Sequence, residues 1–179
     1  TISIDNPEIS VLFADIVNFT VMSEKLSAEN IVGFLDDMFS KFDELTEKYE
    51  VEKIKTIGDA YMVVSGLTSE NRSHAAILFE FGQELLKIAS NYKDHKGEPI
   101  TLRIGINSGP AVSGVIGKSK FSFDIWGDTI NTAARLESYG VPSRIHMSEK
   151  TFELINQNIE HQKKNIEIKG KGLVQTVII

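Results

Sequence analysis

The order of hydrophobic periodicities along the first 108 residues constrains the fold more than any other feature of this chain. A continuous apolar run at residues 8–15 predicts a strand that is buried on both faces. Apolar residues at spacings of three and four then predict an amphipathic helix, for which Ser27 is the expected N-cap. Two β-rich runs, 50–57 and 60–66, meet at a Gly-Asp pair that is typical of a hairpin turn.

A second amphipathic helix from Ser73 to about Asn91 and a strand at 100–108 complete the order β-α-β-β-α-β. This order predicts an α+β fold with a ferredoxin-like βαββαβ core and a mostly antiparallel sheet. The rest of the chain predicts a C-terminal αβ extension. Its expected elements are two strands within 110–125, a helix from Asp128 to Ser138 capped by Asp128 or Thr129, a strand near 144–147, a short helix capped by Ser148, and strands at 165–169 and 173–178.

Composition narrows the class of protein. The chain has 179 residues, of which 41% are hydrophobic and 25% charged, as in an ordinary globular domain. Its net charge of −6 argues against a nucleic-acid-binding surface, and the absence of cysteine excludes disulfides and thiolate metal sites. No apolar run approaches the roughly 20 residues that span a bilayer.

We therefore expect one domain over residues 1–179, with no membrane contact of its own. Because the chain begins at Thr1 and enters a strand almost at once, we expect a domain excised from a longer multidomain protein. The expected location is cytoplasmic, within a parent protein that can be membrane-attached.

Two aspartates sit where strands end. Asp15 closes the first predicted strand, and Asp59 lies in the turn of the predicted hairpin. Each alone has an ordinary explanation, because aspartate is common in turns and at helix N-caps. Together, at the ends of adjacent strands, they form a hard-oxygen platform suited to Mg²⁺ that carries phosphates.

A second polar pair lies on the helix predicted from Asp128. Asn131 and Arg135 are four residues apart and therefore share one face of that helix. An amide and a guanidinium so placed can orient a ribose and neutralise charge on a reacting phosphate. A solvated surface helix is the alternative explanation of the same two residues.

Five separated motifs, in order, resemble those of the catalytic domain of class III nucleotidyl cyclases. The resemblance covers roughly residues 8–178, and the order of the motifs makes it far more specific than any one motif alone. The motifs are Phe13-Ala14-Asp15-Ile16-Val17-Asn18-Phe19-Thr20, Lys53-Ile54-Lys55-Thr56-Ile57-Gly58-Asp59-Ala60-Tyr61-Met62, Leu102-Arg103-Ile104-Gly105-Ile106-Asn107-Ser108-Gly109-Pro110, the segment from Asp124 to Arg135, and Ile168-Lys169-Gly170-Lys171-Gly172.

The resemblance implies that a cyclic nucleotide forms when the ribose 3′-oxygen attacks the α-phosphate and pyrophosphate leaves. Two divalent ions per site, Mg²⁺ or Mn²⁺, are implied at Asp15, Asp59 and the backbone carbonyl of Ile16. Asn131 is implied to hold the ribose and Arg135 to stabilise charge on the α-phosphate.

Phosphate contacts are implied at two further places. Arg103 and Lys169 are the expected ligands of the β- and γ-phosphates, with Lys171 as an alternative to Lys169. The turn that contains Phe19 and Thr20 presents backbone N–H groups to phosphate. Asn18 stands in this turn where the family commonly has glycine, and asparagine tolerates the left-handed backbone that such a turn requires.

The resemblance also places Lys55 and Asp124 against the edge of the purine. A lysine donates to N1 of adenine and a carboxylate accepts from its 6-amino group. Guanine reverses both groups, so Asp124 would face its O6 at a cost of about 1–3 kcal/mol. ATP is therefore the expected substrate, and a guanylyl cyclase, which usually carries glutamate and a small residue at these positions, is the near alternative.

In this family one protomer supplies the metal ligands and its partner supplies the residues for base, ribose and transition state. Because this chain carries both sets, we expect a homodimer with two composite sites. Two other classes remain as alternatives. A non-catalytic dimerising regulatory module would have lost some of these residues, and a polymerase-palm-like cyclase would lack the Asn131/Arg135 helix.

Overall fold

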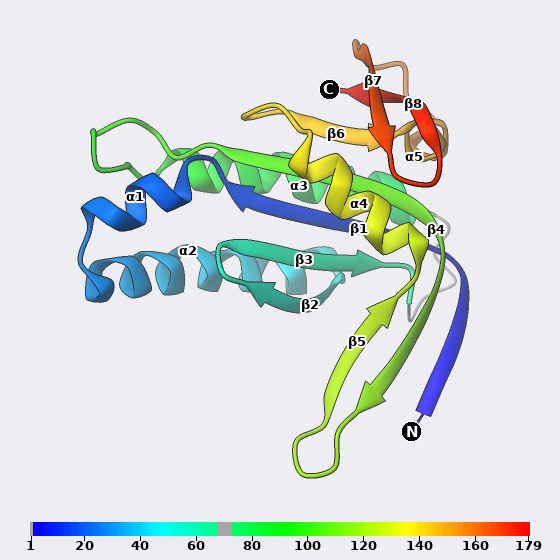
Figure 1. Cartoon of the computed structure of the whole chain (residues 1–179), viewed down its shortest axis with the longest axis horizontal. Coiled ribbons are helices and arrows are strands. Elements are labelled where there is room, and N and C mark those ends of the chain that lie inside the picture. The colour runs from blue at the N-terminus through cyan, green and yellow to red at the C-terminus, as the bar shows by residue number, and fades with distance from the viewer. Residues whose placement is uncertain (1, 68–72) are drawn as a thin grey trace.

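The computed structural model describes residues 2–67 and 73–179 as one mixed sheet with helices on both faces (Figure 1). The elements in chain order are β1 Ile2–Ile16, α1 Phe19–Lys25, α2 Ala28–Tyr49, β2 Glu52–Ile57, β3 Ala60–Ser65, α3 His74–Ser90, β4 Leu102–Ile116, β5 Ser122–Trp126, α4 Asp128–Ser138, β6 Ile145–Ser148, α5 Glu149–Ile155, β7 Gln162–Ile168 and β8 Gly172–Ile178.

The strands lie in the order β2-β3-β1-β4-β6-β8-β7, with β5 paired to β4 outside this path. All pairs are antiparallel except β4 with β6. The predicted α+β class, the mostly antiparallel sheet and the order of the core elements are therefore confirmed. The seven-residue helix α1 was not predicted.

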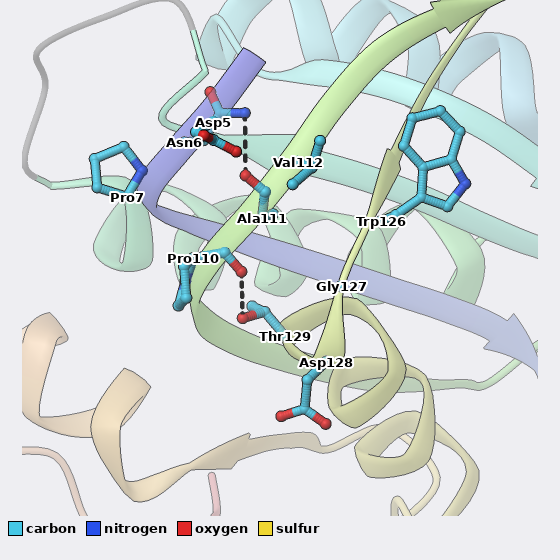
Figure 2. A pocket seen from close by; sticks show the side chains of 10 residues that line it. All are labelled: Asp5, Asn6, Pro7, Pro110, Ala111, Val112, Trp126, Gly127, Asp128 and Thr129. Atoms are coloured by element: carbon cyan, nitrogen blue, oxygen red, sulfur yellow. Dashed lines mark hydrogen bonds between the residues drawn. The ribbon is translucent and has the colours of Figure 1, made fainter. Parts of the chain in front are cut away.

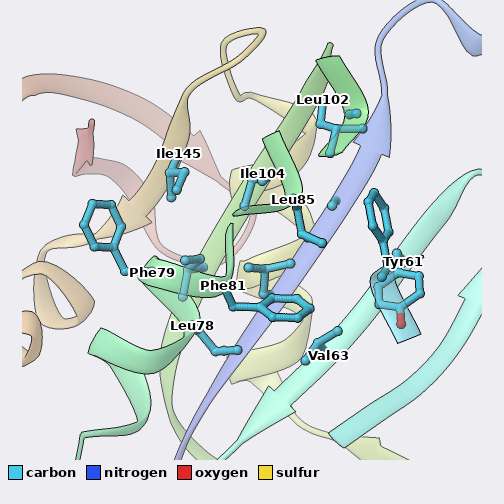
Figure 3. Close-up of a cluster of buried hydrophobic side chains, with 14 of the residues drawn as sticks. Tyr61, Val63, Leu78, Phe79, Phe81, Leu85, Leu102, Ile104 and Ile145 are labelled. Atoms are coloured by element: carbon cyan, nitrogen blue, oxygen red, sulfur yellow. The ribbon is translucent and has the colours of Figure 1, made fainter. Parts of the chain in front are cut away.

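The apolar run of β1 is buried on both faces, as its lack of alternation predicts. Leu12 and Ala14 pack with side chains of α2 and α3 on one face of the sheet. Val11 and Phe13 pack with α4 on the other. Figure 3 shows the first of these clusters, in which α3 covers β3 and β4. We call the face of the sheet that α2 and α3 cover the helix-pair face, and the opposite face, which α4 covers, the α4 face.

The segment predicted as separate strands around residue 109 is one continuous strand, β4, which corrects that prediction. Pro110 lies opposite the point where the register of β1 shifts, between Asn6 and Ile9. A proline lacks the N–H that a regular ladder needs, and an irregularity of this kind tolerates it. The far half of β4, with β5 and the start of β1, projects from the body of the sheet (Figure 1). We call this projection the arm.

The predicted helix caps have mixed outcomes. Ser27 and Ser148 cap α2 and α5 through backbone N–H groups, as predicted. The prediction that Asp128 or Thr129 caps α4 is wrong, because Gly127 occupies that position with φ 140°. The hydroxyl of Thr129 instead donates to the Pro110 carbonyl at 2.7 Å and so ties α4 to the arm.

Candidate active site

Six of the residues predicted for the site line one pocket at the end of β1. The pocket has a volume of about 320 Å³ and opens between the β2–β3 turn and the start of α1. Its lining residues are Asp15, Ile16, Asn18, Phe19, Thr20, Val21, Asp59 and Arg103. Segments more than 80 residues apart in the sequence therefore meet here, as the resemblance led us to expect.

The two aspartates are held in different ways. Asp59 accepts a hydrogen bond from the backbone N–H of Ile16 at 3.1 Å through Oδ2. Asp15 lies opposite Arg103 in the β1–β4 register, with 3.9 Å between Oδ1 and the guanidinium Nε. Both of these buried atoms lack a hydrogen-bond partner among the described residues.

Electrostatics around this pocket favour the binding of positive charge. Burial raises the pKa of Asp59, and the neighbouring Asp15 carboxylate acts in the same direction, while the Ile16 N–H opposes it. A cation placed between the two carboxylates would relieve both the burial and the mutual repulsion.

The donor set fits Mg²⁺ or Mn²⁺ bound together with phosphate. No group of three or more acidic, histidine or cysteine side chains capable of holding a metal occurs in residues 2–67 and 73–179. Magnesium, however, is commonly held by only one or two carboxylates, with substrate phosphates and water completing its shell. Oδ1 of Asp15, which has no hydrogen-bond partner among the described residues, is available for such a bond.

Sequence reasoning missed Glu137, which lies on the buried side of α4 against this cluster. Burial raises the pKa of Glu137, and the Asp15 carboxylate beside it adds to the effect. The signal was present in the sequence: Glu137 follows Ala133 by four residues and therefore falls on the apolar face of the predicted helix. A carboxyl group at such a buried position costs free energy unless a neighbouring group stabilises it, so it indicates a polar or charged partner nearby.

The turn into α1 adopts the conformation that its asparagine suggested. Asn18 has φ 59°, in the left-handed region, and its carbonyl accepts the N–H of Met22. The substitution of glycine by asparagine at this position is therefore compatible with the turn.

Lys55 and Asp124 meet as expected. The Lys55 ammonium lies 2.7 Å from Oδ2 of Asp124, which joins β2 to β5. Oδ1 of Asp124 accepts a hydrogen bond from the backbone N–H of Ile125 at 2.8 Å, which fixes the rotation of the carboxylate. The lysine side chain keeps 44% of its surface exposed, so a ligand can still reach the pair.

Asn131 and Arg135 lie one turn apart on the exposed side of α4, as predicted. The helix packs directly on β4, because Gly105 leaves no side chain between them. Neither residue lines the Asp15–Asp59 pocket. A single chain therefore carries the two sets of predicted site residues in different places.

The two lysines of the β7–β8 turn differ in their contacts. The Lys171 ammonium lies 2.5 Å from the Asp128 carboxylate and 3.5 Å from the hydroxyl of Thr132, both on α4. Lys169 is exposed at the end of β7.

Another cavity, of about 460 Å³, lies at the root of the arm (Figure 2). Its wall includes Trp126, Val112 and the first turn of α4, and it contains none of the predicted site residues. Two of the polar side chains drawn there are already engaged, since Asn6 donates to the Ala111 carbonyl and Thr129 to that of Pro110.

Comparisons with known proteins agree with this geometry. The family model for the adenylate and guanylate cyclase catalytic domain matches residues 3–179. An adenylate cyclase of Mycobacterium tuberculosis is 39% identical over 170 residues, covering 94% of this chain and 38% of the relative. Guanylate cyclase 2D of Rattus norvegicus is 40% identical over 176 residues, covering 94% of this chain and 16% of the relative. The chain thus spans well under half the length of these relatives.

Among solved structures, the catalytic core of a rhodopsin-guanylyl cyclase with converted specificity, in complex with ATPalphaS, superposes with a TM-score of 0.92. It is 36% identical, and the match covers 99% of this chain and 97% of that one. Both adenylate and guanylate cyclases are therefore similar to this chain, and the chain belongs to the family of adenylate and guanylate cyclase catalytic domains.

Proposed function

We propose that this domain is an adenylyl cyclase that converts ATP to 3′,5′-cyclic AMP and pyrophosphate. In this reaction the bond from the ribose 3′-oxygen to the α-phosphorus forms, and the bond from that phosphorus to the β-phosphate oxygen breaks. The proposal depends above all on the Lys55–Asp124 pair, which presents a donor and an acceptor 2.7 Å apart.

This pair matches the edge of adenine. Lys55 would donate to N1 and Asp124 would accept from the 6-amino group. Against guanine, the carboxylate would face O6 and the ammonium would face a ring N–H, which leaves like groups in contact. In the absence of nucleotide, the two side chains satisfy one another.

The remaining predicted site residues would contact the ribose and the three phosphates of the nucleotide. Asn131 would hold the ribose, and Arg135 would neutralise charge that develops on the α-phosphate during attack. Arg103 and either Lys169 or Lys171 would hold the β- and γ-phosphates, with the N–H groups of the Asn18–Thr20 turn. Bound at Asp15, Asp59 and the Ile16 carbonyl, two Mg²⁺ or Mn²⁺ ions would lower the pKa of the 3′-hydroxyl and screen the triphosphate.

We further propose that the active site is completed by a second copy of the chain. Asn131 and Arg135 do not line the pocket of their own chain, which supports sharing between two copies. The arm supports it as well, because large apolar side chains are exposed along it. These are Ile2, Ile4, Val112, Ile116, Phe121, Phe123 and Trp126.

Initial rates with ATP and with GTP, each measured in Mg²⁺ and in Mn²⁺, test the proposed activity. We expect cyclic AMP to form from ATP at a rate well above that of cyclic GMP from GTP. Preference for GTP would refute the base assignment. If a folded dimer forms neither cyclic AMP nor cyclic GMP, the enzymatic proposal is refuted and a regulatory module is favoured.

Exchange of the two base-reading residues is a sharper test of the same assignment. Lys55→Glu combined with Asp124→Cys should lower ATP turnover and raise GTP turnover, because the donor and acceptor pattern is then reversed. Unchanged use of ATP by this variant would show that the two residues do not contact the base.

A further inference from the structure

The strand that carries Lys55 contains one residue too many for a regular ladder. Lys53 pairs with Val63 on β3, yet Lys55 pairs with Met62, the very next residue along β3. Ile54 and Lys55 therefore lie opposite a single residue, which defines a β-bulge. Bulges of this kind turn the strand locally and change the direction of the side chains that follow.

The bulge sends two nearby lysines to opposite faces of the sheet. In a regular strand, residues two apart point to the same face. Val63, opposite Lys53, belongs to the helix-pair face, whereas Met62, opposite Lys55, belongs to the α4 face. The contacts agree, since Lys53 meets α2 while Lys55 meets Asp124 on β5.

A polar anchor holds the bulged strand on the helix-pair face. Oδ1 of Asp43, on α2, lies 2.9 Å from the Lys53 ammonium and accepts the Tyr61 hydroxyl at 2.5 Å. The same ammonium lies 3.2 Å from Oδ2 of Asp43 and 5.2 Å from the centre of the Tyr61 ring. One carboxylate thus binds both strands of the hairpin.

The tyrosine in this anchor is itself immobilised. Tyr61 is fully buried, and its ring centre lies 5.3 Å from those of both Phe39 and Phe42 on α2. Its partner in the β2–β3 register is Thr56, on the far side of the bulge from Lys53. The anchor therefore contacts the hairpin on both sides of the bulge and fixes it to α2.

We propose that Asp43, Lys53 and Tyr61 are positioning residues that hold the bulge and so set where the Lys55 ammonium lies against the purine edge. This proposal rests on the adenylyl cyclase function proposed above. A lysine side chain is long and flexible, and its selectivity depends on a fixed backbone origin. The bulge determines where the backbone of Lys55 lies, and the contacts of Asp43, Lys53 and Tyr61 hold it there.

Base selectivity separates this role from a merely structural one. The hairpin also carries Asp59, but a metal ligand serves ATP and GTP alike, so general loosening of the hairpin should lower both rates together. Only displacement of Lys55 should change the ratio of kcat/KM for ATP to that for GTP.

The principal variant is Lys53→Met, which keeps the length and apolar stem of the side chain. We expect the ATP-to-GTP ratio to fall by about tenfold, since small displacements of a positioned group have effects of this order or larger. Lys53→Arg, which preserves the charge near Asp43, should restore most of the ratio. Lys87→Met is the matched control, because it removes a lysine from an ion pair of 3.1 Å with Glu84 on α3.

Removal of the other two partners tests whether they act as one unit. Asp43→Asn and Tyr61→Phe should each lower the ratio, and Asp43→Asn combined with Lys53→Met should cost little more than either single change. Full additivity of the two changes would contradict a shared anchor.

Amide hydrogen exchange tests the anchor without any nucleotide. Lys53→Met should speed exchange at residues 54–56 and leave α3 unchanged, whereas Lys87→Met should leave residues 54–56 unchanged. The proposal fails if exchange at 54–56 is unaffected, or if ATP and GTP rates fall equally. If the unmodified domain uses neither nucleotide, the proposed function fails, and the exchange result alone then decides whether the anchor exists.

Discussion

Asp15 and Asp59 line the same pocket but depend on the chain in different ways. Asp59 is fixed by the Ile16 N–H, so its position requires that β1 and the β2–β3 turn are both in place. Asp15 faces Arg103 and the buried Glu137 and keeps an oxygen without a hydrogen-bond partner among the described residues. Asp59 is therefore oriented by a backbone N–H group, whereas Asp15 is surrounded by charged side chains.

This difference makes Asp59→Asn a clean test of charge at the proposed metal site. The amide oxygen can still accept the Ile16 N–H, so we expect the melting temperature to change by no more than about 2 °C. The loss of charge should lower turnover by about 10²-fold or more, as removal of a group that stabilises developing charge does.

The same substitution at Asp36, on the exposed side of α2, is the control and should leave turnover unchanged. Turnover in Asp59→Asn close to that of the unmodified domain would contradict a metal role for Asp59. Steady-state rates and thermal unfolding measured on the same preparations separate the two effects.

At this scale, residue types and spacing predicted much of the site. The pattern of strand-end carboxylates placed Asp15 and Asp59 together, and the resemblance placed Lys55 beside Asp124. Glu137 escaped because a helical pattern shows which face is buried but not what a buried acid meets. The bulge at Ile54 escaped because β2 is only six residues long and almost wholly exposed, so it has too few buried apolar residues to show the change of phase that one extra residue causes.

At the scale of elements, the helix that carries Asn131 and Arg135 can pack close to β4 because Gly105 has no side chain. A Cβ at Gly105 would lie 2.3 Å from the Glu137 nitrogen and 2.7 Å from the Ala133 carbonyl oxygen. Both are backbone atoms, which cannot give way without displacement of the helix. β4 therefore holds α4 at a distance that only glycine allows.

Gly105→Ala should displace α4 and destabilise the domain by about 1–3 kcal/mol, as overpacking does. Thermal or denaturant unfolding measures the loss, and turnover should fall because Asn131 and Arg135 move with the helix. Gly33→Ala is the matched control. Nothing lies within 4 Å of its added Cβ on α2, so this change should stabilise by about 0.5–1 kcal/mol. Equal effects of the two substitutions would contradict this packing.

A buried histidine joins the end of α4 to the C-terminal strands. His146 is fully buried, with Nδ1 2.8 Å from the Leu136 carbonyl and Nε2 2.5 Å from the Thr176 hydroxyl. Burial lowers its pKa from the ordinary 6.5, so the unfolded chain takes up a proton at a pH where the folded chain does not. Stability from this residue is therefore present above pH 6.5 and is lost as the pH falls.

Melting temperatures at about pH 7.5 and about pH 5.5 test this linkage. His146→Gln removes the titrating group, so the drop between the two pH values should shrink by roughly 2 °C or more, although the variant is less stable at both. The same substitution at the exposed His161 is the control. A drop as large in His146→Gln as in the unmodified domain would refute this contribution.

Elements were predictable where local sequence decides them. The helices begin at Ser27 and Ser148 because serine side chains satisfy the first N–H groups. The N-cap of α4 is instead Gly127, and the hydroxyl of Thr129 donates to the arm. Continuity of β4 through Pro110 likewise depends on the register of β1, and such long-range pairing is not visible in local sequence.

At the scale of the whole molecule, the proposed site is divided between two copies of the chain. The pocket with Asp15 and Asp59 is one half, and the residues of β2, β5 and α4 are the other. The described residues contain no helix long and apolar enough to cross a membrane. The exposed apolar side chains of the arm, with Phe121 77% accessible, are the surface we propose for contact with the second copy.

Mixing two inactive variants tests this division most directly. Asp59→Asn lacks one half of the site and Arg135→Ala lacks the other, so each alone should be inactive. Random pairing of equal amounts gives heterodimers in which one of two sites is intact, and activity should recover to about a quarter of that of the unmodified domain. Activity that stays at the sum of the two separate variants would contradict the shared site.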